Sequence, residues 1–183
     1  MNHTNFEFKA KCPDSNKHEE IRHYLEMKGA EFKGIDHQRD TYFRVRKGRL
    51  KLRRGNIESS LIYYEREDTK DPKTSNIILY PVDKKSQDSL EALLLKIFDV
   101  LIIVEKKREI YFLENVKFHI DSIDNLGLFI EVEAIDINGS LGVDKIRNQC
   151  YQYLELFNID PADLIKVSYS DLLLTKDSIN LHE

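Results

Sequence analysis

The 183-residue sequence has only two cysteines, no long hydrophobic run and no excess of positive charge. Cys12 and Cys150 stand apart without the C-x-x-C spacing of a structural zinc site, and two isolated thiols also argue against a disulfide framework. The longest aliphatic run, at residues 100–104, is far shorter than the ~20 residues that cross a bilayer. We therefore expect a soluble protein without a disulfide scaffold.

The charge balance argues against a protein that binds nucleic acid through its overall charge. Lys and Arg together number 28 against 32 Asp and Glu, a net charge of −4, so the chain lacks the global positive field that attracts nucleic acid. The first 11 residues contain charges and no apolar segment typical of a secretory signal, so we expect the chain to stay in the cytoplasm. A length of 183 residues with 41% apolar side chains predicts a single domain, residues 1–183.

Short stretches of alternating polar and apolar residues dominate the chain and predict about eight strands. They cover residues 5–11, 40–45, 50–54, 60–66, 75–80, 101–113, 116–123 and 129–137. Apolar residues at helical spacing predict helices at residues 16–28, 88–98 and 140–157, followed by a short element at 168–174. Asn16 with Glu19 and Asp88 with Glu91 have the spacing of capping pairs for the first two helices.

The polar faces of these strands carry ordered pairs of charged groups. Helices packed on the apolar faces would turn the charged faces toward each other inside a barrel of about eight strands. Several cations confined together are costly unless a polyanion neutralises them, so the pattern indicates a polyanionic ligand. The alternative is an antiparallel sheet whose charged face is simply solvated. The pairs are Glu7 and Lys9, Lys51 and Arg53, Lys106 and Arg108, His119 and Asp121, and Glu131 and Glu133.

Five motifs, in their order along the chain, resemble those of the CYTH superfamily, which joins class IV adenylate cyclases, thiamine triphosphatases and inorganic triphosphatases. The motifs are Glu-x-Lys at residues 7–9, Leu-Lys-Leu-Arg at 50–53, Glu-Lys-Lys-Arg-x-x-Tyr at 105–111, His-x-Asp at 119–121 and Leu-Gly-x-Phe-x-Glu-x-Glu at 126–133. The opening at residues 5–10 is similar to a bacterial branch labelled adenylate-cyclase-like. The resemblance implies an α+β triphosphate tunnel fold: an antiparallel eight-stranded β-barrel with helices packed outside.

The resemblance also implies roles for individual residues. It makes Tyr42 a candidate for handling the attacking water. In the family a lysine accompanies this tyrosine, and Arg66 is the nearest cation to that position in this sequence. The resemblance implies a nucleoside or other organic triphosphate as ligand, no nucleic acid or membrane partner, and a homodimer as one assembly, since related proteins are often dimers. The candidate ligands of Mg²⁺ or Mn²⁺ are Glu7, Asp121, Glu131 and Glu133, and the candidate triphosphate-binding residues are Lys9, Lys51, Arg53, Arg66, Lys106 and Arg108.

Two departures from the family pattern bear on catalysis. Asn5 stands where the family has the first Glu of Glu-x-Glu-x-Lys, which removes one carboxylate. Arg66 can bind phosphate, but a guanidinium does not readily act as a base. The expected function is a metal-dependent enzyme that either cyclises ATP to cyclic AMP and pyrophosphate or hydrolyses a triphosphate. The alternatives are a non-catalytic triphosphate- or polyphosphate-binding module and a plain interaction module.

Overall fold

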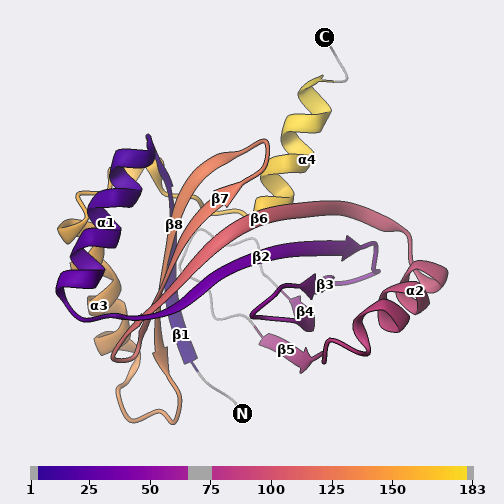
Figure 1. Cartoon of the computed structure of the whole chain (residues 1–183), viewed down its shortest axis with the longest axis horizontal. Helices are drawn as coiled ribbons and strands as arrows, with labels where there is room; N and C mark the ends of the chain where they lie inside the picture. Colours follow the sequence, from indigo (N-terminus) through magenta and orange to yellow (C-terminus); the bar gives the residue numbers. More distant parts are fainter. Residues whose placement is uncertain (1–3, 66–75, 181–183) are drawn as a thin grey trace.

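The computed structural model describes residues 4–65 and 76–180 of the chain, which form one antiparallel sheet with helices around it (Figure 1). The helices are α1 (Ser15–Met27), α2 (Gln87–Ile97), α3 (Val143–Leu156) and α4 (Tyr169–Asn180), with a short 3-10 helix at Pro161–Asp163. The strands are β1 (Thr4–Cys12), β2 (Glu31–Phe43), β3 (Arg49–Arg54), β4 (Ser60–Glu65), β5 (Asn76–Pro81), β6 (Val100–Leu113), β7 (Val116–Ile123) and β8 (Gly127–Asp136).

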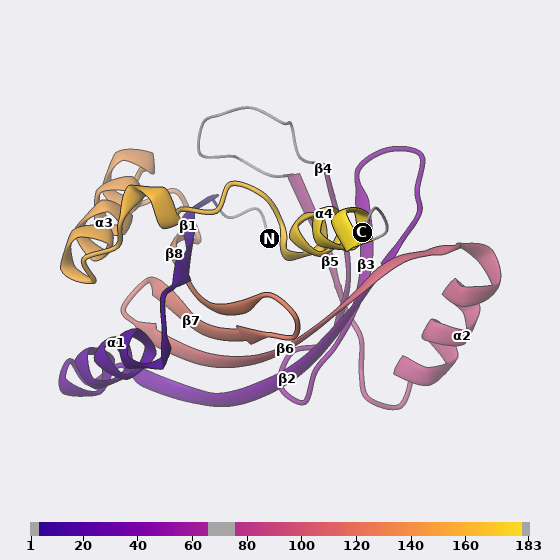
Figure 2. The same ribbon diagram turned by 90° about the horizontal axis from the view of Figure 1, so that it is seen from above.

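The sheet has eight strands in the order β1-β8-β7-β6-β2-β3-β4-β5. Every neighbouring pair is antiparallel. The sheet curls into a half-barrel with one convex and one concave face, and α1, α2 and α3 lie outside the curve (Figure 2). This confirms the predicted α+β class with eight antiparallel strands, and three of the helices, α1, α2 and α3, lie outside the curve as expected.

The convex face is apolar where α1, α2 and α3 cover it, because the strand residues of that parity are hydrophobic there. The middle of β2 and β6 instead presents exposed charged residues on this face, such as the ion pair of Arg39 and Glu105. Phe8 and Val132 on this face pack in one buried cluster with Ile21 of α1 and Ile146 of α3. Under α2, Leu94 joins a separate cluster with residues of β2 and β3. Helices α1, α2 and α3 thus cover the apolar side chains of the strands, and the charged side chains at the alternate positions face the concave side.

Helix α4 differs from the other helices because it lies on the concave side of the sheet (Figure 2). Its Tyr169 and Leu173 pack with Val104 of β6 and with other residues of the concave face. A reciprocal cap begins the helix: the Ser168 N–H donates to Asp171 at 3.0 Å, and the Asp171 N–H donates to the Ser168 hydroxyl at 3.2 Å. The helix extends to Asn180, beyond the expected end at residue 174.

The predicted capping pairs of the first two helices are wrong. Helix α1 is capped by Asp14, whose carboxylate accepts from the backbone N–H groups of residues 16 and 17, because Asp14 is the residue with extended backbone before the first turn. Helix α2 has no side-chain cap. Its Asp88 and Glu91 instead bind Arg54 of β3, since a guanidinium offers a stronger partner than a backbone N–H.

Strand β2 begins at Glu31, nine residues before the expected start at residue 40. It pairs with β6 along its length, with a register shift between Phe32 and Gly34. The first half of β2 carries polar residues on both faces, so it lacks the alternation of polar and apolar residues from which strands are predicted. The extra length adds Asp36 and Gln38 to the concave face.

Within the described ranges, no helix is both long and apolar enough to cross a membrane.

Candidate functional site

Side chains from three adjacent strands converge on Asp40 of β2. Its carboxylate, 1% exposed, accepts hydrogen bonds from Lys51 Nζ at 2.8 Å and from Lys106 Nζ at 3.0 Å. Arg53 donates to both oxygens, with Nε 2.9 Å from Oδ1 and Nη2 3.0 Å from Oδ2. The register sets Arg53 directly opposite Asp40. Three cations therefore share one buried carboxylate, which leaves an excess of positive charge around Asp40.

The pKa values in this cluster reflect that excess. Burial would raise the pKa of Asp40, but the charges of the three cations hold it well below its usual value. Burial, followed by the charge of Arg53, holds the pKa of Lys106 well below that of an exposed lysine. Burial also lowers the pKa of Lys51. Another anion would favour the charged form of both lysines, so the cluster is suited to binding a further anionic group.

Arg108 of β6 forms a second cluster with Asp121 of β7 and Glu131 of β8. Its Nε and Nη2 lie 2.7 and 2.6 Å from the two Asp121 oxygens, and Nη2 lies 3.2 Å from Glu131 Oε2. The hydroxyl of Tyr169 in α4 donates to Asp121 at 2.8 Å. Burial opposes the charge of Arg108, but Asp121 and Glu131 raise its pKa well above the usual value. Arg108 thus remains a cation although it is buried.

Glu131 also contacts Lys9 of β1 and His119 of β7. Lys9 Nζ lies 3.2 Å from Glu131 Oε2 and 4.3 Å from the ring centroid of Tyr169. His119 Nδ1 lies 3.5 Å from Glu131 Oε1, and within the described parts of the chain neither ring nitrogen forms a hydrogen bond. Burial, and then the charge of Arg108, lowers the pKa of His119, so its ring is neutral at neutral pH.

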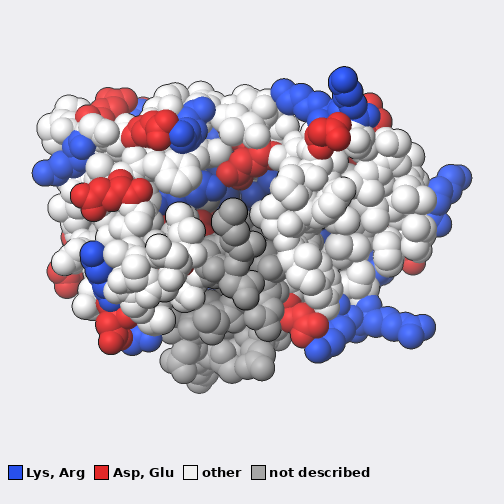
Figure 3. All heavy atoms as spheres, turned by 90° about the horizontal axis from the view of Figure 1, so that it is seen from below, with Lys and Arg blue, Asp and Glu red and all other residues white. Residues whose placement is uncertain are grey.

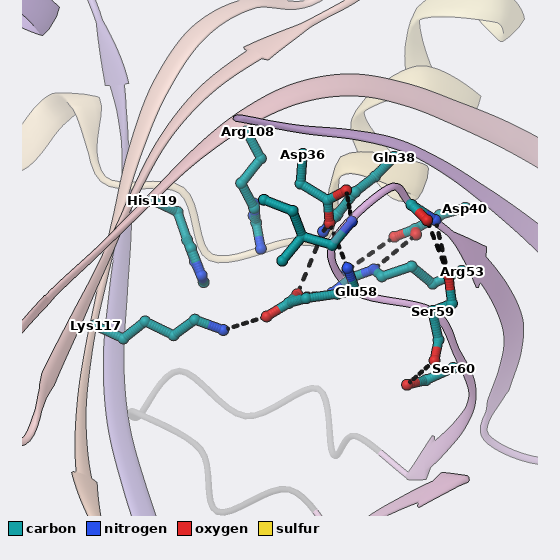
Figure 4. A network of polar contacts seen from close by, with 12 residues as sticks. Asp36, Gln38, Asp40, Arg53, Glu58, Ser59, Ser60, Arg108, Lys117 and His119 are labelled. Atoms are coloured by element: carbon teal, nitrogen blue, oxygen red, sulfur yellow. Dashed lines mark hydrogen bonds and ion pairs between the residues drawn. The ribbon is translucent and has the colours of Figure 1, made fainter. Parts of the chain in front are cut away.

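A third network surrounds Glu58 in the connection between β3 and β4 (Figure 4). Its carboxylate accepts from Lys117 of β7 at 2.7 Å, from Arg53 at 3.3 Å and from the Gln38 amide at 3.3 Å. Burial would raise the pKa of Glu58, but Lys117 and then Arg53 lower it to about 2. The pair of Glu58 and Lys117 joins the β3–β4 connection to β7 across the concave face.

Asp36 of β2 holds the β3–β4 connection in place. It is fully buried and accepts from the backbone N–H of Ile57 at 2.8 Å and of Glu58 at 3.0 Å. Gln38 Nε2 donates to the same carboxylate at 2.7 Å. Gly55 approaches so closely that a Cβ atom there would lie 2.5 Å from Asp36 Oδ1. This anchor fixes Glu58, and through Glu58 it fixes one side of Arg53.

Tyr42, the predicted catalytic tyrosine, lies beside the Asp40 cluster. Its hydroxyl accepts from Lys51 Nζ at 3.3 Å, and the same ammonium lies 5.2 Å from the ring centroid. Burial, and then the charge of Asp40, raises the pKa of Tyr42 to about 12. Tyr42 is therefore a neutral phenol at neutral pH, able to donate to a water or phosphate oxygen but not to act as a base.

The four predicted metal ligands do not form a metal site in the arrangement described. Among residues 4–65 and 76–180, no group of three or more His, Cys, Asp or Glu side chains is placed to hold a metal ion. Asp121 and Glu131 bind Arg108, and Glu133 accepts from the Asn5 amide at 2.5 Å. Glu7 lies opposite Glu133 in the register of β1 and β8. The donors are hard carboxylate oxygens of the kind Mg²⁺ prefers, but cations or an amide hold three of them.

The structure thus brings most of the predicted site residues to one concave surface. A space-filling view shows charged side chains of both signs in a hollow between two mainly uncharged regions of one face (Figure 3). Arg66, predicted to bind phosphate and to assist catalysis, lies outside the described residues. Sequence reasoning missed several residues of the surface, of which Asp40 could have been found because it shares the parity of Tyr42 two positions later. The missed residues are Asp36, Gln38, Asp40, Glu58 and Lys117.

Comparisons with known proteins agree with this architecture. The CYTH domain model matches residues 3–169. A Methanocaldococcus jannaschii protein named "Putative adenylate cyclase MJ0240" is 29% identical over 176 residues, which span 91% of this chain and 96% of that protein. The solved structure of protein PH1012 from Pyrococcus horikoshii aligns with a TM-score of 0.76 at 24% identity, covering 92% of this chain and 99% of that one. One from Vibrio parahaemolyticus, titled a "putative adenylate cyclase", aligns with a TM-score of 0.70 at 17% identity, covering 94% and 99%. The chain belongs to the CYTH domain family.

Proposed function

We propose that the protein is an enzyme that binds a nucleoside or other organic triphosphate on the concave face of its sheet. The observation that carries this proposal is the convergence of Lys51, Arg53 and Lys106 on the single buried carboxylate of Asp40. Buried like charges repel each other and lose hydration, so this grouping is costly unless an anion joins it. Phosphate oxygens supply such an anion, and the guanidinium of Arg53 can bind them in bidentate fashion.

The residues of the site would act by positioning and by charge stabilisation. The cations around Asp40, with Arg108 and Lys9 beside them, would neutralise charge that develops on the phosphate oxygens as a bond to phosphorus breaks. Tyr42, a neutral phenol next to this cluster, would orient the attacking group through a donated hydrogen bond. Lys51 contacts both Tyr42 and Asp40, so it would hold the phenol toward the phosphate-binding cations.

Two reactions fit this site. In cyclisation the ribose 3′-oxygen attacks the α-phosphorus and pyrophosphate leaves, whereas in hydrolysis a water attacks the terminal phosphorus and orthophosphate leaves. The name of the Methanocaldococcus relative favours the cyclase. The deciding experiment is turnover of ATP, GTP, thiamine triphosphate and tripolyphosphate, with cyclic nucleotide, pyrophosphate and orthophosphate counted separately. Cyclic AMP with an equal amount of pyrophosphate supports the cyclase, and orthophosphate alone excludes it.

Metal dependence is a separate part of the proposal. The family resemblance implies Mg²⁺ or Mn²⁺ with Glu7, Asp121, Glu131 and Glu133 as ligands, which would supply charge neutralisation at the phosphates. Because Glu131 already contacts two cations, a metal would have to compete with Lys9 and Arg108 for its oxygens. Calorimetric titration of Mn²⁺ with and without tripolyphosphate tests this part. Equal turnover in excess chelator and in Mg²⁺ would contradict it.

A second candidate is a binding module that takes up a triphosphate without converting it. It is favoured by the Asn5 amide, which replaces a family carboxylate and binds Glu133 at 2.5 Å. Tight binding without any product, in Mg²⁺ and in Mn²⁺, would support the binding module. Turnover that is lost in Glu131→Gln but kept in a variant of an exposed carboxylate, such as Glu155→Gln on α3, would eliminate it.

A further inference from the structure

Gln38 of β2 carries a buried hydrogen-bond acceptor without a donor. The side chain is 3% exposed, and in the described parts of the chain its Oε1 atom has no hydrogen-bond partner. Its Nε2 atom donates to Asp36 at 2.7 Å and to Glu58 at 3.3 Å. Both partners are carboxylates, which accept hydrogen bonds when ionised, so the amide cannot be turned around without opposing oxygen to oxygen. The network therefore fixes Oε1 as the unused end of this side chain.

His119 of β7 is a second buried polar group that lacks a hydrogen bond in the part of the chain that the structure describes. It is 2% exposed, and its Nδ1 lies 3.5 Å from Glu131 Oε1. The register places Gln38 opposite Lys106 and His119 opposite Ile110, so both flank Arg108 on the concave face of β6 (Figure 4). The unpaired Oε1 of Gln38 and the ring nitrogens of His119, which have no partner among the described residues, thus lie on either side of a phosphate-binding candidate.

Phosphate groups do not suit the unpaired acceptor of Gln38. At neutral pH most oxygens of a triphosphate are ionised and accept hydrogen bonds, and the cations of this surface further disfavour a proton on the terminal phosphate. The cations around Asp40 suit such oxygens, but Gln38 Oε1 needs a partner that donates. Leaving a buried acceptor unpaired costs free energy, and a site built to pair it rejects a ligand that lacks the donor.

We propose that Gln38 and His119 form a subsite for a hydrogen-bond donor on the organic part of a triphosphate, such as a hydroxyl, amino or ring N–H group. The subsite would make the protein select a donor-bearing organic triphosphate over inorganic tripolyphosphate. This inference rests on the proposed function, because it extends the same concave surface beyond the cations that would hold the phosphates.

The test compares three ligands by isothermal titration calorimetry of the wild-type chain at one Mg²⁺ concentration. ATP carries an organic part with donors, methyl triphosphate carries an organic part without donors, and tripolyphosphate has no organic part. We expect ATP to bind about tenfold or more tightly than either of the other two, the usual effect of pairing one buried group. Equal affinity for ATP and tripolyphosphate, or for ATP and methyl triphosphate, would overturn the inference.

The Gln38→Met variant links the selectivity to the residue. It keeps the length of the side chain but removes both the acceptor and the amide group that donates to Asp36 and Glu58. We therefore expect the ratio of ATP affinity to tripolyphosphate affinity, rather than either affinity alone, to fall about tenfold. Gln152→Met on the exposed face of α3 is the matched control and should change neither affinity. Unchanged selectivity in Gln38→Met contradicts the inference alone, whereas binding of none of the three ligands to wild type overturns the proposed function with it. The wild-type comparison stands even where the variant fails to fold.

Discussion

Asp40 is the residue that determines the electrostatic state of the concave face. It is a single anion held by three cations. Its carboxylate compensates buried positive charge, and under the proposed function the same carboxylate would compete with an incoming polyanion. Stability and ligand affinity should therefore respond to Asp40 in opposite directions.

The Asp40→Asn variant tests this opposition. Removing the charge leaves three buried cations with less compensation, so we expect the free energy of unfolding to fall by about 3–5 kcal/mol. The freed cations should bind tripolyphosphate about tenfold more tightly, as measured by calorimetry, and the ligand should raise the Tm of the variant more than that of wild type. Asp144→Asn, whose side chain is 94% exposed on α3, is the control. Weaker tripolyphosphate binding in Asp40→Asn would show that Asp40 does not compete with the ligand.

Glu58 makes the stability of the chain depend on pH at low pH. The pKa of Glu58 is lowered in the folded protein to about 2, from the ordinary value of about 4.5 that it has in the unfolded chain. Its contribution is fully present above the unfolded pKa and is lost as the pH falls through the folded pKa. We expect the free energy of unfolding of Glu58→Gln to be about 3 kcal/mol lower than that of wild type at pH 6. This difference should shrink as the pH falls from ~4.5 to ~2. Urea unfolding at each pH measures it, and a difference that stays constant would contradict the pairing with Lys117 and Arg53.

At the scale of the element, the connection between β3 and β4 is as important for the site as the strands. Asp36 binds two of its backbone N–H groups, and Gly55 packs against the same carboxylate. The connection carries Glu58, which reaches across to Lys117 of β7. A distortion here would loosen Arg53 on its Glu58 side without touching the strands themselves.

The Gly55→Ala variant should produce that distortion. The added methyl group would lie 2.5 Å from both Asp36 Oδ1 and the Glu58 carbonyl oxygen, so the connection must move. We expect a loss of about 1–3 kcal/mol in unfolding free energy and a weaker affinity for ATP. Gly139→Ala, where nothing lies within 4 Å of the added methyl group, should cost only the backbone strain of about 1 kcal/mol and leave ATP affinity unchanged. Wild-type stability and affinity in Gly55→Ala would contradict the tight packing at Asp36.

At the scale of the whole molecule, the sequence predicts the residues of the site only on those strands whose polar–apolar alternation shows which side chains share a face. Alternation on β1, β3, β6, β7 and β8 predicts which side chains share the concave face, because successive side chains point to opposite faces. It fails on the first half of β2, where both faces are polar, and on Glu58, which lies in a connection and has no parity. The pairing of Asp40 with three cations depends on register and curvature, which alternation alone does not specify. That the chain forms a single domain, and that it assembles as a homodimer, both remain predictions.

The central claim is that the cations of the concave face bind a triphosphate. Its most direct test is calorimetric titration of ATP into wild type and into the double variant Arg53→Gln/Lys106→Met, with the exposed Arg147→Gln on α3 as control. We predict that wild type and control bind ATP with micromolar affinity, and that the double variant binds at least about a hundredfold more weakly because two charge-assisted contacts are lost. Equal binding by the double variant, or no binding by wild type, would contradict the claim.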